Sequence, residues 1–160
     1  MSQTQAPPDN APGPFQEGQV VAVCLSQKKG TAKTPVENAT LIPDFGMEND
    51  AHAGKWHRQV SLLDYGQVLD FNKKGAQVTH GDFGENILVS GINLKTIPVG
   101  TKLTLGQATL EVTQIGKECH SHCQIFKRVG DCIMPREGIF AKVLSGGEIK
   151  AGDTVVVHTS

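Results

Sequence analysis

Short apolar runs separated by turn residues dominate the pattern of this chain. Residues 20–25 (VVAVCL) and 60–63 (VSLL) are compact apolar runs of the kind that form buried strands. Similar short runs follow at residues 87–90, 102–105, 108–115, 138–144 and 154–158. Residues 31–55 form a long polar connection with one short strand at 39–42. The pattern predicts about seven short strands in a mainly β, antiparallel-rich barrel or sandwich.

One segment repeats its apolar residues at helical spacing. Asp64 has Gln67 three residues after it, which is the spacing of a capping box at a helix start. Gly75 after two lysines suits a helix end. We therefore expect one or two short helices beside the strands. The apolar stripe of this helix consists of Tyr65, Val68, Leu69 and Phe71.

The composition indicates one domain. Residues 1–19 hold four of the eight prolines and almost no large apolar side chain, so we expect a disordered tail before a single domain at 20–160. The formal net charge of -1 gives no global attraction to nucleic acid or to an anionic membrane. No apolar run is long enough to span a membrane and no signal peptide is recognisable, which predicts a cytoplasmic protein.

Cysteines are concentrated in residues 115–153. Cys119, Cys123 and Cys132 lie there, whereas Cys24 lies in an apolar run and is expected to be an inert, buried side chain. Because cytosolic thiols are kept reduced, the cluster favours reactive-thiol or metal chemistry over disulfides. Lysines, arginines and histidines around Cys123 would lower the pKa of a thiol and favour its reactive thiolate.

Zinc binding is a second interpretation of the same segment. It would make the protein a non-catalytic module that binds zinc or a partner, although a C-x3-C pair followed by a cysteine nine residues later is unusual for structural zinc. His52 and His57 are further potential metal ligands, but histidines in polar loops more often satisfy local hydrogen bonds. The nitrogen and sulfur ligands for this zinc site are Cys119, His120, His122, Cys123 and Cys132.

Four stretches together resemble a known family. They are DAHAGKWHRQVSLL, HGDFGENILVSGINL, CHSHC and REGIFAKVLSGGEIKAGDTVVV. The combination is similar to the MOSC domain, the C-terminal domain of molybdenum cofactor sulfurases, and in particular to standalone bacterial members. The resemblance covers residues 20–157, nearly all of the expected domain.

The resemblance implies a MOSC-like β-barrel that handles the molybdenum cofactor. It also implies a characteristic cysteine that carries sulfur as a persulfide or ligates molybdenum. Cys123, followed by Gln-Ile-Phe, fits the family pattern better than Cys119, and Cys132 is the third candidate. The implied partners are the cofactor and either a cysteine desulfurase as sulfur donor or a molybdoenzyme as client.

The cofactor carries a phosphate and a pterin, so its pocket needs cations and hydrogen-bond partners. Arg58 and Arg136 are the candidate phosphate contacts because a guanidinium bonds two oxygens at once. Lys117 adds positive charge near the cysteines, and His52 is a further candidate contact. The GDFGEN loop is either part of this pocket or a structural turn. Its candidate cofactor contacts are Asp82, Glu85 and Asn86.

The enzymatic activity implied by the resemblance is limited. Full-length sulfurases carry a pyridoxal-phosphate desulfurase domain that this sequence lacks, so we expect no intrinsic cysteine desulfurase activity and a sulfurtransferase-like role at most. A further alternative is molybdenum-dependent reduction of N-hydroxylated compounds, as in some MOSC relatives. Those relatives carry an extra N-terminal domain that is not recognisable here.

Overall fold

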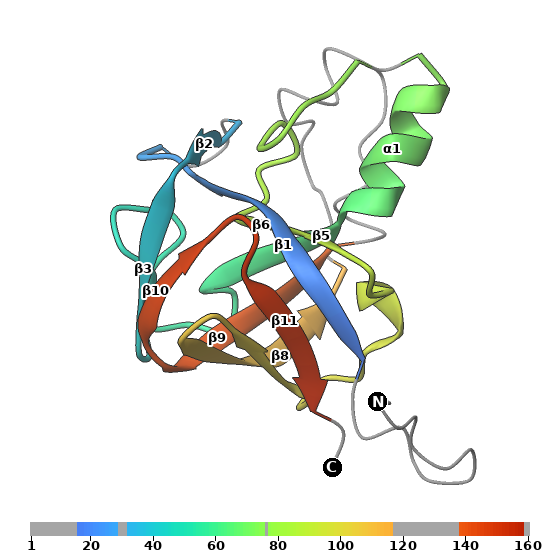
Figure 1. Ribbon diagram of the computed structural model, residues 1–160. Helices are drawn as coiled ribbons and strands as arrows, with labels where there is room; N and C mark the ends of the chain where they lie inside the picture. The colour runs from blue at the N-terminus through green and yellow to red at the C-terminus, as the bar shows by residue number, and fades with distance from the viewer. Residues whose placement is uncertain (1–15, 29–31, 76, 117–137, 159–160) are drawn as a thin grey trace, which may run out of the picture.

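A closed β-barrel forms the centre of the protein (Figure 1). The computed structural model describes residues 16–28, 32–75, 77–116 and 138–158. Seven strands close into a ring in the order β1-β11-β7-β8-β9-β5-β6, because β1 pairs with both β6 and β11. The barrel strands are β1 (Glu17–Leu25), β5 (Val60–Asp64), β6 (Ile87–Ser90), β7 (Lys102–Leu105), β8 (Ala108–Ile115), β9 (Ile139–Ser145) and β11 (Thr154–His158). The predicted mainly β barrel of about seven strands is confirmed.

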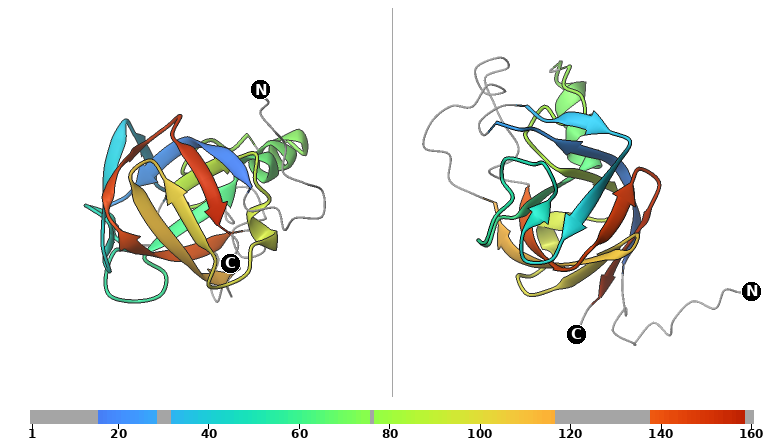
Figure 2. Two further views of the ribbon diagram at one scale, coloured as in Figure 1. Left: turned by 60° about the horizontal axis from the view of Figure 1, so that its bottom comes forward. Right: turned by 90° about the vertical axis from the view of Figure 1, so that its left-hand side faces the viewer.

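The smaller elements attach to one side of the barrel. A second, three-stranded sheet has the order β10-β3-β4, and β2 extends the main sheet beside β1. Figure 2 shows the small sheet beside the barrel, away from the helix. These strands are β2 (Thr34–Val36), β3 (Asn38–Ile42), β4 (Gly46–Met47) and β10 (Gly147–Lys150).

One boundary and one strand count predicted from the sequence were wrong. β1 begins at Glu17, so residues 17–19 lie in the barrel and not in the predicted tail. Residues 31–55 contain three strands where one was predicted, because β2 and β4 have only three and two residues and include Pro35 and Gly46. Such short strands leave no periodicity to detect. The rest of the predicted tail, residues 1–15, lies outside the described residues.

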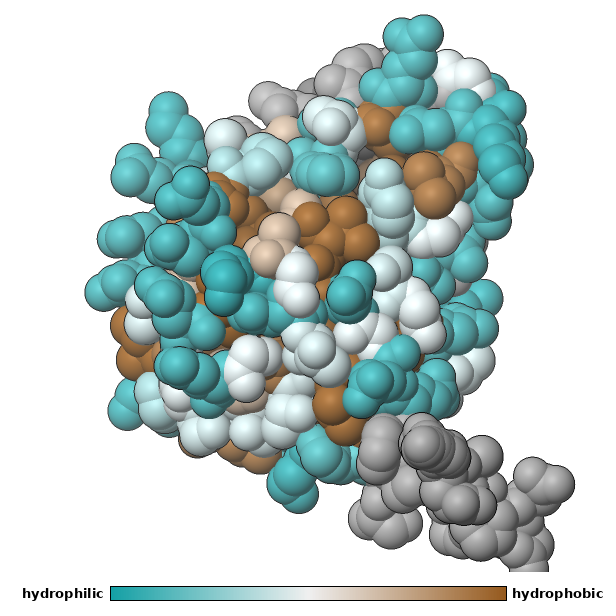
Figure 3. All heavy atoms as spheres, viewed as in Figure 1, coloured by the Kyte–Doolittle hydropathy of each residue, from teal (hydrophilic) through white to brown (hydrophobic). Residues whose placement is uncertain are grey.

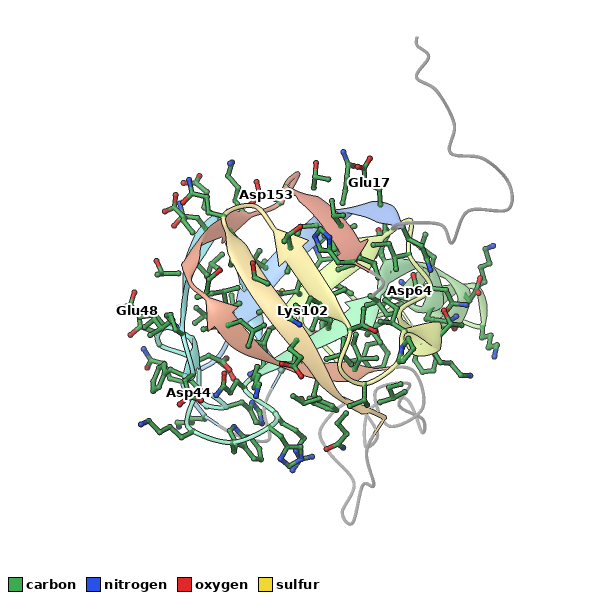
Figure 4. All side chains as sticks on the ribbon, turned by 90° about the horizontal axis from the view of Figure 1, so that it is seen from below. Glu17, Asp44, Glu48, Asp64, Lys102 and Asp153 are labelled. Carbon is green, nitrogen blue, oxygen red and sulfur yellow. The ribbon has the colours of Figure 1, made fainter. Side chains whose placement is uncertain are left out.

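The crossover helix α1 (Tyr65–Lys73) follows from the parallel pairing of β5 and β6. Parallel neighbours need a long connection, usually a helix, whereas antiparallel neighbours need only a turn. The Asp64 side chain accepts a hydrogen bond from the Gly66 N–H and thereby caps the helix start. In Figure 4 Asp64 lies on the side of the barrel opposite Asp44 and Glu48, which belong to the small-sheet side. A short 3-10 turn, η1 (Leu94–Thr96), follows β6.

Two apolar clusters fill the molecule. The first occupies the barrel interior and draws on all seven barrel strands. The second lies outside the barrel wall, where Val68 and Phe71 of α1 pack with Phe83 and Phe140. Figure 3 shows apolar atoms on this face between the barrel and the helix, surrounded by hydrophilic side chains. Cys24 belongs to the second cluster and is fully buried, as the sequence predicted.

Asn86 joins three barrel strands at the start of β6. Its Oδ1 accepts the backbone N–H of Ser61 in β5 at 3.0 Å, and its Nδ2 donates to the carbonyl of Cys24 in β1 at 3.1 Å. The side chain is fully buried. A buried backbone group that loses its partner carries a desolvation penalty, so these bonds hold the place where the parallel pair closes the ring.

Replacing this amide therefore tests the closure of the barrel. We expect Asn86→Ala to lower the free energy of unfolding by about 2–4 kcal/mol, because two buried backbone groups lose their partner. The matched control is Asn93→Ala, since Asn93 is exposed and makes no capping bond through its side chain. Urea denaturation of both variants measures the difference. Equal stabilities would contradict the proposed bridge.

Candidate functional site

The cysteine-rich segment is anchored at the paired ends of β8 and β9. Gly116 N donates to Gly138 O at 2.7 Å, and residues 117–137 connect these two glycines. Five sequence-predicted site residues belong to this connection and lie outside the described residues. They are Lys117, Cys119, Cys123, Cys132 and Arg136.

Arg58 lies beside this anchor. Its guanidinium carbon is 4.8 Å from the centroid of the Trp56 ring and 5.6 Å from that of Phe140, which is on β9 two residues after Gly138. Stacking against aromatic faces orients a guanidinium without using its N–H donors. The buried Nε of Arg58 has no hydrogen-bond partner among the described residues. A buried N–H of a cation without a partner indicates a place for an acceptor.

The loop that carries Arg58 is fastened to the end of β8. The carbonyl of His57 accepts a hydrogen bond from the Thr113 hydroxyl. His57 Nε2 lies 2.8 Å from Gln114 Oε1, and Gln114 Nε2 donates to Gly116 O at 2.7 Å. The loop and the anchor of residues 117–137 are thus held together by side-chain hydrogen bonds.

His52 lies in the same loop and contacts a buried ion pair. Lys33 Nζ is 2.8 Å from Asp50 Oδ1, and both side chains are fully buried. The same Nζ lies 3.0 Å from His52 Nδ1. Trp56 Nε1 donates to the His52 carbonyl at 2.8 Å, which connects this group to the ring under Arg58. The structure therefore brings together His52 and Arg58, two of the predicted contacts.

Lys33 and Asp50 were not predicted as site residues. Lys33 follows a turn in a polar stretch, and lysines in such stretches are usually exposed. The only sequence signal for this group was weak. It was the spacing of Asp50, a hydrogen-bond acceptor, two residues before the titratable ring of His52. That the buried cation of Lys33 contacts both residues is evident only from the structure.

The GDFGEN loop folds around its own glutamate. Glu85 is fully buried, and its carboxylate accepts N–H groups of Gly81 at 2.7 Å and Phe83 at 3.1 Å. Gly81 has a positive φ of 87°, and a Cβ there would lie 2.0 Å from the Lys33 carbonyl oxygen, so only glycine fits. Asp82 Oδ2 accepts the Thr79 N–H at 2.9 Å.

The carboxyl and amide groups of this loop thus serve its own structure. Glu85 bonds the loop backbone, and Asn86 bonds two strands. Direct contact of Asp82, Glu85 or Asn86 with a cofactor stays a prediction. The loop nevertheless meets the His52 group through the backbone, because Lys33 N donates to Gly81 O at 2.8 Å.

Burial is the largest cause of the raised pKa values of Glu85 and Cys24. It raises the pKa of Glu85 to about 7 against the hydrogen bonds from the backbone, which lower it. It also raises the pKa of Cys24 to about 12, with a further contribution from the nearby Glu85 charge. At neutral pH the Cys24 thiol is therefore protonated and unreactive.

The described part of the chain holds no group of three or more His, Cys, Asp or Glu side chains placed to bind a metal ion. Nor does it contain a helix long and apolar enough to cross a membrane. The five ligands of the zinc site considered from the sequence lie in residues 117–137, outside the described residues, whereas His52 and His57 are described.

The chain is similar to known proteins both in sequence and in fold. A family model of the MOSC domain matches residues 49–156, more than half of the chain. The YUAD protein from Bacillus subtilis has a crystal structure that is 16% identical with a TM-score of 0.75, covering 91% of this chain and 98% of that one. YiiM from Geobacillus stearothermophilus is 19% identical with a TM-score of 0.69, over 89% and 75% of the two chains.

YiiM from Escherichia coli is 16% identical with a TM-score of 0.63, over 90% of this chain and 70% of that one. At these identities the likeness to solved structures shows the fold alone. No curated protein matches the sequence significantly.

The raised pKa of Glu85 predicts a pH-dependent stability. The folded state binds a proton to Glu85 more tightly than the unfolded state, whose value is near 4.5. The contribution of Glu85 to stability is therefore complete below about pH 4.5 and is lost as the pH rises through about 7. As the pH rises from about 5 to about 8, the ionisation of Glu85 should lower the free energy of unfolding by roughly 2–3 kcal/mol.

Urea denaturation at both pH values measures this change. Glu85→Gln should remove the decrease, since an amide does not titrate, although it should also lower stability at both pH values because one N–H loses its acceptor. Glu148→Gln, at an exposed glutamate, serves as the control and should keep the wild-type slope. A wild-type slope in the Glu85 variant would contradict the assignment.

Proposed function

The chain belongs to the MOSC domain family, and on this premise we propose that it binds the molybdenum cofactor and relays sulfur to it or ligates it through Cys123. The family places the protein in molybdenum-cofactor-related function in general terms. The surroundings of Arg58, the burial of Cys24 and the anchor of residues 117–137 support the specific role.

The unpartnered Nε of Arg58 is the observation that carries this proposal. A buried cationic N–H donor next to the ends of β8 and β9 suits an anionic oxygen ligand such as the cofactor's phosphate. Trp56 and Phe140 lie at cation–π distance from the guanidinium, and such contacts use none of its N–H donors. Arg136, in residues 117–137, is the second proposed phosphate contact.

The donor set of the site also fits the rest of the cofactor. His52 is the proposed hydrogen-bond contact from the loop, and Lys117 adds a positive charge next to Gly116. When bound, the cofactor supplies a molybdenum centre, for which soft thiolates are suitable ligands. We assign the protein ligand of the metal to Cys123, whose sequence context resembles that of the family's cysteine.

The cysteines are unequal as sulfur carriers. Cys24 is fully buried and its pKa is raised to about 12, so it has neither access to a donor nor a thiolate. This leaves Cys119, Cys123 and Cys132 in residues 117–137. Cys123 is preferred because its sequence context resembles that of the family's cysteine.

Sulfur receipt needs no group beyond a donor persulfide. The Cys123 thiolate attacks the outer sulfur of the donor's persulfide, and the donor S–S bond breaks. The donor cysteine leaves as a thiolate, while Cys123 gains the sulfur atom as its own persulfide. A cysteine desulfurase is the proposed donor and a molybdoenzyme the proposed client, both in the cytoplasm.

Mass spectrometry tests the carrier role. After incubation with a cysteine desulfurase and cysteine, the peptide that contains Cys123 should gain about 32 Da, the mass of one sulfur atom. Cys123→Ser should abolish the adduct without lowering stability, whereas Cys24→Ala, which removes a thiol from the apolar core, should keep it. Full loading of Cys123→Ser together with loss in Cys119→Ser would reassign the carrier.

Elemental analysis of the same preparations distinguishes the zinc interpretation. The proposal predicts no stoichiometric zinc and no unfolding on chelation. One zinc ion per chain, with unfolding when a chelator is added, would refute the reactive-thiol account.

A further prediction concerns Arg58. We expect Arg58→Gln to weaken binding of isolated molybdenum cofactor by at least tenfold, because one charge-assisted hydrogen bond contributes roughly 1.5–3 kcal/mol. Arg58→Lys should restore only part of the affinity, since an ammonium lacks the planar fork. Lys55→Gln removes one exposed charge from the same loop and is the control, expected to change affinity less than about twofold. Equal effects of Arg58→Gln and Lys55→Gln would show that only net charge matters.

A further inference from the structure

Strand β8 carries a β-bulge at Thr113. The ladder passes from Val112 to Gln114 while the partner strand β9 advances by only one residue, so Thr113 is an extra residue without a partner in the ladder. Val112 lies in the barrel interior, and side chains alternate between the two faces of a regular strand. Without the extra residue, Gln114 would therefore follow Val112 into this apolar interior. With it, the side chains of Thr113 and Gln114 both reach His57 in the loop between β4 and β5.

The hydroxyl of Thr113 lies between two backbone carbonyls. Its Oγ1 donates to the carbonyl of His57 and lies 3.2 Å from the carbonyl oxygen of Phe140 on β9. A hydroxyl has one hydrogen, which these two acceptors share in a three-centre arrangement. This single side chain therefore connects the loop between β4 and β5 to the neighbouring strand β9.

Both carbonyls belong to the groups that support Arg58. The His57 carbonyl is part of the planar peptide unit that ends at the Cα of Arg58, so its hydrogen bond with Thr113 fixes where the arginine side chain begins. The ring of Phe140 lies 5.6 Å from the guanidinium carbon. The Thr113 hydroxyl thus acts on the backbone before Arg58 and on the residue beside its guanidinium.

The guanidinium of Arg58 depends on such support. Its buried Nε has no hydrogen-bond partner among the described residues, so no hydrogen bond directs this N–H. Contacts with the Trp56 and Phe140 rings are less directional than hydrogen bonds. An arginine side chain also loses much rotamer freedom when it is fixed. The direction of the Nε–H therefore depends on how firmly the backbone of Arg58 and the two rings are held.

We propose that Thr113 is a positioning residue: its hydroxyl, placed by the β-bulge, fixes Arg58 so that the buried Nε–H is held ready for an anionic oxygen of a ligand. The assignment of that oxygen to the phosphate of the molybdenum cofactor rests on the proposed function. The hold on Arg58 does not, because all its groups belong to the ligand-free protein.

Hydrogen exchange between water and the Arg58 Nε–H tests this hold. The signal is measured by NMR on the ligand-free, full-length protein and is assigned by its loss in Arg58→Gln. Thr113→Ala should speed the exchange roughly three- to tenfold, because one hydrogen bond that fixes the loop is lost. Thr113→Ser keeps the hydroxyl and should stay within about twofold of the wild type. Unchanged exchange in Thr113→Ala would overturn the proposal.

Thr109→Ala is the matched control for this experiment. Thr109 lies on the same strand, and its hydroxyl makes no hydrogen bond within the part of the chain that the structure describes. Exchange of the Arg58 Nε–H should be unchanged in this variant. The backbone N–H of Val112, which donates to Thr101 O at 2.9 Å, is the internal reference for a general loosening of β8. Equal acceleration of this amide and of the Arg58 Nε–H would overturn the positioning role.

The wild type supplies a test that needs no variant, should Thr113→Ala fail to fold. Only one staggered χ1 position points the hydroxyl at the carbonyls of His57 and Phe140. Three-bond couplings should therefore show a single χ1 rotamer of Thr113. Averaging between rotamers would overturn the proposal.

Inorganic phosphate, a simple oxyanion, tests the consequence for binding. Thr113→Ala should bind phosphate roughly three- to tenfold more weakly than the wild type, whereas Thr113→Ser and Thr109→Ala should stay within about twofold. Equal affinities of Thr113→Ala and the wild type, or absence of phosphate binding to the wild type, would overturn the proposal. Phosphate binding that depends on Thr113, in a protein that does not bind the molybdenum cofactor, would support the proposal and refute the proposed function alone.

Discussion

The parallel pairing of β5 and β6 is the constraint on which the rest of the structure depends. It requires a crossover, which the chain supplies as α1 and the GDFGEN loop on the outer wall of the barrel. Beside the backbone pairing of β5, β6 and β1, the Asn86 side chain adds hydrogen bonds to β5 and β1 at the start of β6. The second apolar cluster and the buried Glu85 exist because this crossover has to be packed against the barrel.

The loop between β4 and β5 is connected to the crossover through Lys33, which contacts Asp50 and His52 of the loop and bonds Gly81 through its backbone. Gly81 lets the backbone around Lys33 approach the crossover, and the buried Lys33–Asp50 pair then orders His52. A buried ion pair contributes little net stability unless all its hydrogen bonds are made, and here the ammonium has a partner for each donor. Such a pair is better understood as a device that fixes the direction of neighbouring groups than as a source of stability.

The sequence predicted the parts of the structure that have strong local patterns. Long β-branched runs such as β1 and β8, and the Asp64-capped helix, were recognisable because burial imposes periodicity on them. The strands β2, β4 and β10 were missed because two to four residues carry no period. Arg58 was selected as a candidate contact for its chemistry, and that role stays a prediction. Lys33 was not selected, since it meets Asp50 and His52, which are 17 and 19 positions away in the sequence.

The central claim is that sulfur from this chain reaches the molybdenum of a bound cofactor. X-ray absorption at the molybdenum edge of the cofactor-loaded, persulfide-treated protein examines that claim most directly. The account predicts a sulfur neighbour of molybdenum in addition to the dithiolene sulfurs, contributed as a thiolate or as transferred sulfur. A molybdenum centre whose only sulfur neighbours are those of the dithiolene, in protein that binds the cofactor, would contradict it.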